Sequence, residues 1–69
     1  MWILDQTKSE VVNVNNYDSI VNLRGPIRVI RESSYENLGS YDQERAAQVF
    51  EEILTSLAKG DQLFRMPEK

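Results

Sequence analysis

The stretch from Leu38 to Ile53 limits the possible folds most, because it predicts the end of a strand followed at once by a helix. Gly39 closes an extended run, and Asp42 (or Ser40) has a side-chain oxygen that can accept hydrogen bonds from the free amides of a first helical turn. Apolar residues then recur at steps of three and four, as on a helix that covers a sheet: Ala46, Val49, Phe50, Ile53, Leu54 and Leu57. Gly60 predicts the end of this helix, since glycine readily adopts the left-handed conformation of a C-terminal cap.

The residues before the helix predict short strands, because apolar and β-branched residues are grouped between turn signals. These runs are residues 1–6, 11–14, 19–23, 27–31 and 35–38. The turn at residues 24–26 (Arg-Gly-Pro) predicts an antiparallel hairpin, and residues 62–66 are long enough for one more strand at a sheet edge. Trp2 is expected to pack under the helix against Phe50 or Ile53, since large apolar side chains are buried first.

Together these elements predict one α+β domain over residues 1–69. We expect a small antiparallel sheet of four to five strands, packed by one C-terminal amphipathic helix and followed by a final short strand or tail. A chain of this size buries only roughly 60% of the surface that its unfolded form exposes. The absence of cysteine and histidine excludes disulfides and the common zinc sites. Self-association is the remaining source of added stability, so a homo-oligomer is expected.

The first apolar run, Met1 to Leu4, is too short for a signal peptide or a membrane span. We therefore expect a cytoplasmic protein without membrane contact. The formal net charge of −3 opposes binding to nucleic acid, which needs a basic face to replace counterions. Nucleic acid is accordingly the weakest of the partner classes considered.

The residue types argue against catalysis. Without histidine or cysteine, the usual nucleophile and base pairs are missing. Glu51 and Glu52 are adjacent, but neighbours on a helix point about 100° apart and do not converge on one substrate atom. There is no glycine-rich phosphate loop and no EF-hand spacing. The sequence therefore predicts no enzyme, no metal site and no cofactor.

Three arginines on the predicted hairpin form a candidate binding site, because arginine can hold a phosphate or carboxylate by two hydrogen bonds. They are Arg24, Arg28 and Arg31. The alternative is that they are surface side chains paired with nearby acids such as Glu32 and Glu36. Dimerisation along the hairpin would bring six arginines together and make an anionic ligand plausible.

Two further groups of side chains are candidate contacts. Tyr17 and Tyr35 lie near predicted strand ends, where they are free to touch a ligand or a partner. Glu44, Glu51 and Glu52 give the helix an acidic side that would suit a basic partner protein.

Several short segments resemble a group of very short uncharacterised proteins from Gram-positive bacteria and their phages. The segments are Met1-Trp-Ile, Val12-Asn-Val-Asn15, Leu38-Gly-Ser-Tyr-Asp, Glu44-Arg-Ala46, Val49 to Ile53 and Met66-Pro-Glu. The resemblance implies the same fold and a phage or mobile-element setting, and it carries over no functional residue. The chain departs from the group's pattern at residues 24–31, where its hairpin is more basic.

These observations leave three hypotheses for function. The first is a small phage-type accessory protein that binds and inhibits a host protein, such as a defence component. The second is an oligomeric sponge that sequesters an anionic, nucleotide-like signal molecule. The third, direct nucleic-acid binding, is opposed by the net charge.

Overall fold

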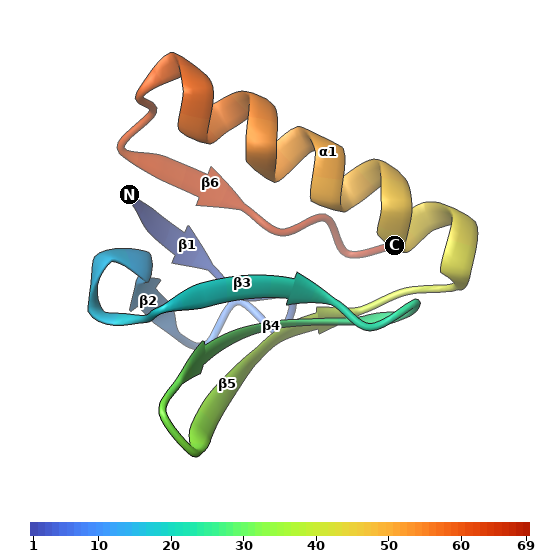
Figure 1. Ribbon diagram of the computed structural model, residues 1–69. Coiled ribbons are helices and arrows are strands. Elements are labelled where there is room, and N and C mark those ends of the chain that lie inside the picture. Colours follow the sequence, from blue (N-terminus) through green and yellow to red (C-terminus); the bar gives the residue numbers. More distant parts are fainter.

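The computed structural model describes residues 1–69 and consists of two three-stranded sheets, one α-helix and a short 3-10 turn (Figure 1). The elements are β1 (Trp2–Leu4), β2 (Val11–Asn13), η1 (Val14–Asn16), β3 (Ser19–Asn22), β4 (Pro26–Arg31), β5 (Ser34–Ser40), α1 (Gln43–Lys59) and β6 (Leu63–Arg65). The α+β class is as predicted. The prediction of one sheet of four to five strands is wrong in detail, because six strands are divided equally between two sheets.

The first sheet has the order β2-β1-β6, in which β2 is antiparallel and β6 is parallel to β1. The second sheet has the order β3-β4-β5 and is antiparallel throughout, as the turn at residues 24–26 predicts. The two sheets meet at one corner, where the N–H of Gln6, just after β1, donates to the Leu38 carbonyl of β5 at 2.8 Å. Helix α1 packs against β3 and β4, and β6 lies between α1 and β1 (Figure 1).

The core lies between the two sheets and the helix, and strand alternation decides which side chains enter it. Its fully buried members include Ile3 from β1, Ile27 and Val29 from β4, Leu38 from β5, and Ala46, Val49 and Ile53 from α1. Because Ile3 points inward, its neighbour Trp2 points outward and is 48% exposed. The expectation that Trp2 packs under the helix is therefore wrong, although Phe50 does pack against the core.

Helix α1 begins and ends where the sequence predicts. Asp42 is the N-cap, and its Oδ1 accepts from the Arg45 N–H at 2.9 Å. Gly60 is the left-handed C-cap, with a φ of 77°. The predicted apolar stripe is only partly buried, because Leu54 and Leu57 lie on the exposed side of the helix.

Ser56 takes a core position in place of these leucines. Its buried hydroxyl donates to Asp61 Oδ2 at 2.7 Å, so this polar group is buried with a hydrogen-bond partner. Helix α1 is not long and apolar enough to cross a bilayer.

Candidate interaction surface

The three hairpin arginines do not converge within one chain. Arg24 lies in the turn before β4, Arg28 in its middle and Arg31 at its end. A strand of six residues extends over roughly 20 Å, so the two outer arginines lie far apart. Arg28 and Arg31 are also three residues apart on one strand, which places their side chains on opposite faces of the sheet. A shared anion site would therefore need a second chain.

Arg28 is the one of the three whose side chain makes defined contacts. Its guanidinium lies over the Tyr35 ring, 4.3 Å from the ring centroid, and its Nε donates to Asn37 Oδ1 at 3.4 Å. No ion pair joins these arginines to Glu32 or Glu36, so the expected pairing with nearby acids is not formed. The Arg28–Tyr35 stack is a cation–π contact that holds the guanidinium on an exposed sheet face.

The two predicted tyrosines differ in their surroundings. Tyr35 is exposed, whereas Tyr17 is partly buried and packs against the core. The main-chain N–H of Tyr17 also closes the η1 turn by donating to the Val14 carbonyl. Of this pair, Tyr35 is the one that is free to contact a partner.

The helix acids separate into two groups. Glu44 is exposed in the first turn of α1 and lies outside any hollow. Glu51 and Glu52 line an open hollow of about 360 Å³ between α1 and β6, which we call the acidic hollow. Its complete lining is Glu51, Glu52, Thr55, Ser56, Lys59, Asp61 and Phe64. Three carboxylates and one ammonium give this lining a formal charge of −2.

An apolar surface lies on the outer face of the sheet β2-β1-β6, and sequence reasoning missed it. Strand register places Trp2 beside Leu63 of β6, and Leu4 beside Val11 of β2. Trp2, Val11 and Leu63 are 48%, 49% and 42% exposed. We call these four side chains the Trp2 face. The signal that could have found it is the alternation in β1, which allows only one of Trp2 and Ile3 to be buried.

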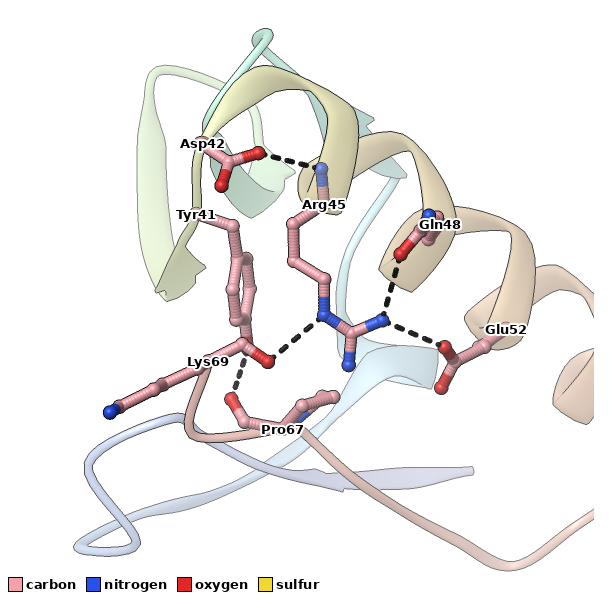
Figure 2. A network of polar contacts seen from close by, with 7 residues as sticks. All are labelled: Tyr41, Asp42, Arg45, Gln48, Glu52, Pro67 and Lys69. Carbon is pink, nitrogen blue, oxygen red and sulfur yellow. Dashed lines mark hydrogen bonds and ion pairs between the residues drawn. The ribbon is translucent and has the colours of Figure 1, made fainter.

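A polar network fastens the C-terminal tail to the start of the helix (Figure 2). The Tyr41 hydroxyl donates to the Pro67 carbonyl at 2.6 Å. Arg45 Nε donates to the Lys69 carbonyl at 2.9 Å, and its Nη1 donates to Gln48 Oε1 and pairs with Glu52 at 3.4 Å (Figure 2). Tyr41 and Arg45 thus serve the fold, and Glu52 contributes to both the network and the acidic hollow.

Gln6 also fastens the tail. Its Nε2 donates to the Glu68 carbonyl at 2.8 Å, while its Oε1 accepts from the Ser40 N–H at 2.7 Å. Lys8 forms an ion pair and hydrogen bond with the Glu68 carboxylate. These contacts join parts of the chain that are more than 30 residues apart in sequence.

Two titratable groups of this network have shifted pKa values. Burial raises the pKa of Tyr41 above its ordinary value; the nearby positive charge of Arg45 partly opposes this shift, and Glu52 adds to it. The hydrogen bond and positive charge from Lys8 lower the pKa of Glu68. Both shifts follow from contacts that hold the tail in place.

No group of three or more carboxylates is arranged to hold a metal ion. The chain matches no protein-family model, no curated protein and no solved structure among those compared.

Proposed function

We propose that this chain is a non-enzymatic binding protein that inhibits a host protein by covering part of its surface. The resemblance to short phage proteins makes a bacterial factor, such as a defence component, the first class of target to test. The proposal also includes a cytoplasmic site of action, where such a target would be met.

The strongest support for this proposal is the position of β6 between an apolar surface and an acidic one. The Trp2 face lies on the outer side of the sheet, and the acidic hollow lies between β6 and α1. Protein interfaces commonly combine an apolar centre that contains an aromatic anchor with a polar rim. Trp2 and Leu63 would supply the apolar contact, and Glu51 would supply part of the acidic rim.

The test is capture of a partner from a bacterial host lysate, followed by reconstitution with the purified partner. We expect Trp2→Ala to weaken binding by about tenfold or more, as for an aromatic anchor. Leu23→Ala is the control, since it removes an exposed apolar side chain that lies outside the Trp2 face. Equal binding by the wild type and both variants, or a bound partner that keeps full activity, would contradict the proposal.

A second candidate function is sequestration of an anionic, nucleotide-like molecule. The observation that favours it is the Arg28 guanidinium, which is held over Tyr35 on an exposed face. A preoriented guanidinium can bind a phosphate with two hydrogen bonds. A thermal-shift screen with nucleotides and cyclic nucleotides tests it: a stabilisation that is lost in Arg28→Ala supports sequestration, and no shift with any ligand contradicts it.

A further inference from the structure

Strand β6 has an open edge, which its hydrogen bonds define. The Trp2 N–H donates to the Gln62 carbonyl at 2.8 Å, and the Met66 N–H donates to the Leu4 carbonyl at 3.0 Å. Residues 62 and 66 therefore direct their main-chain groups toward β1. Since these directions alternate along a strand, Leu63 and Arg65 direct theirs away from β1.

The main-chain groups of Leu63 and Arg65 make no hydrogen bond within the protein. Neither residue takes part in a main-chain hydrogen bond outside the β1–β6 ladder, and no side chain bonds to their main chain. A strand edge with free N–H and C=O groups can pair with a further strand. Here the edge adjoins the acidic hollow, whose lining includes Phe64 of the same strand.

A strand added at this edge would have two different environments for its side chains. Side chains on one face would lie beside exposed Leu63 and extend the Trp2 face. Those on the other face would point into the acidic hollow. Because side chains alternate along a strand, the best match is a segment in which apolar residues alternate with lysine or arginine.

The charge of the hollow also selects between a partner protein and a second copy of this chain. Pairing of β6 with β6 of a second copy across a two-fold axis would bring two acidic hollows together. Each has a formal lining charge of −2, so this arrangement places like charges opposite each other. A basic segment would instead neutralise the hollow.

We propose that β6 binds an extended segment of its partner by strand addition, and that this segment alternates apolar with basic residues. The inference rests on the proposed function, because it names the part of the partner that the surface around β6 recognises. Main-chain hydrogen bonds to Leu63 and Arg65 would give affinity, and the hollow would give preference for positive charge.

The first experiment uses a capped six-residue peptide of alternating lysine and valine, with a glutamate–valine peptide as its charge-reversed control. Amide hydrogen exchange of the full chain is followed by NMR. On saturation with the lysine peptide, we expect exchange at Leu63 and Arg65 to slow by about tenfold or more, since these amides become hydrogen-bonded. The glutamate peptide should leave their exchange unchanged.

Two variants separate the main-chain contribution from that of the side chain. Arg65→Pro removes an N–H that β1 does not use, and proline is tolerated on the open side of an edge strand. We expect it to weaken peptide binding by about tenfold or more, whereas Arg65→Ala should change it by less than about twofold. A lysine peptide N-methylated at every second residue repeats this test on the unaltered protein, so the result does not depend on folding of the proline variant.

Glu51→Gln tests the charge of the hollow, because Glu51 takes no part in the tail network. We expect binding to weaken by about two- to fivefold at low salt, with a smaller effect of added salt than in the wild type. Equal binding of both peptides would contradict the role of the hollow.

Three outcomes would overturn strand addition: no binding of the lysine peptide, protection of amides other than those of β6, or protection by self-association of the free protein. Failure of the proposed function gives a different pattern. If a host partner is captured through Trp2 but binds Arg65→Pro as well as wild type, the binding function stands and strand addition does not. If the peptide binds as described but no partner is inhibited, strand addition stands and the proposed inhibitory function does not.

Discussion

Gly39 of β5 lies beside Tyr41 and Gln6, two of the residues that fasten the tail. A Cβ atom at this position would lie 3.0 Å from the Tyr41 hydroxyl oxygen and 3.1 Å from both Cβ and Oε1 of Gln6. These separations are shorter than ordinary van der Waals contacts, so Gly39→Ala must displace both neighbours. Both neighbours hold the tail, through Pro67 and Glu68.

The expected cost follows from two opposing effects. Overpacking of a well-packed site costs about 1–3 kcal/mol. Replacing glycine by alanine also restricts the unfolded chain, which returns about 0.4–1 kcal/mol. The midpoints of these two ranges differ by about 1.3 kcal/mol, so we expect Gly39→Ala to lower the free energy of unfolding by about that amount. For a domain of this size this lowers the Tm by roughly 5–10 °C.

A double-mutant cycle with Tyr41→Phe identifies the atoms responsible. Tyr41→Phe alone loses the 2.6 Å hydrogen bond to Pro67 and should cost about 1 kcal/mol. It also removes the oxygen that a Cβ at position 39 would meet, so the double variant should be more stable than the sum of the single effects by at least about 0.5 kcal/mol. Urea unfolding followed by far-UV circular dichroism gives each free energy.

Gly60→Ala is the matched control. It also replaces a glycine by alanine, but no atom lies within 4 Å of its added Cβ, and its cost comes from the left-handed φ of 77°. Its effect should add to that of Tyr41→Phe without coupling. Wild-type stability of Gly39→Ala, or strict additivity of Gly39→Ala with Tyr41→Phe, would show that the packing argument is wrong.

Four further predictions concern the cap, the titratable groups and self-association. Asp42→Ala should destabilise the protein to urea by about 0.5–2 kcal/mol through loss of the bond to the Arg45 N–H, whereas Asp42→Asn should retain most of the stability. The pKa of Tyr41 is raised in the folded state, so the stability gained from keeping its phenol neutral is present below the unfolded value of about 10. This stability is lost as the pH rises through the folded pKa. The urea midpoint of the wild type should therefore fall over that pH range, and the midpoint of Tyr41→Phe should fall by less. Because the pKa of Glu68 is lowered, its contribution is present above its ordinary value of 4.5 and lost as the pH falls through the folded pKa. The Glu68 amide resonance should report loss of the Lys8 ion pair there, and Lys8→Met should move the transition up toward pH 4.5. If the Trp2 face also mediates the homo-oligomer expected from the chain's small size, light scattering should detect a species larger than a monomer that Trp2→Asp converts to monomer, and a strictly monomeric wild type would contradict this expectation.

Features set by neighbouring residues could be predicted from the sequence. The helix boundaries at Asp42 and Gly60 depend on local capping, and the hairpin at residues 24–26 depends on turn residues that favour reversal. The position of Glu51 and Glu52 on the solvent-exposed side of the helix also follows from the helical period. These features need no knowledge of distant contacts.

Features set by pairing across the chain could not be predicted in the same way. The third strand of the sheet β2-β1-β6 depends on β6 pairing with β1, although about 60 residues separate them. The same pairing determines that Trp2 lies beside Leu63 on an exposed face. The open edge of β6 could not be predicted either, because the free edge of a strand is known only once its partner strand is known.

The local opening of β6 away from β1 can distinguish a ligand that binds at β6 from one that binds at Arg28. β6 is three residues long and has one neighbouring strand, so its opening exposes little apolar surface and should need less free energy than global unfolding. A ligand that adds a strand to β6 must slow this local opening, because it binds only the closed form. A ligand that binds at Arg28 binds equally well whether β6 is paired with β1 or open, so it leaves the rate of this local opening unchanged. Exchange at the Phe64 amide, which faces β1, should therefore slow with the first kind of ligand and not with the second.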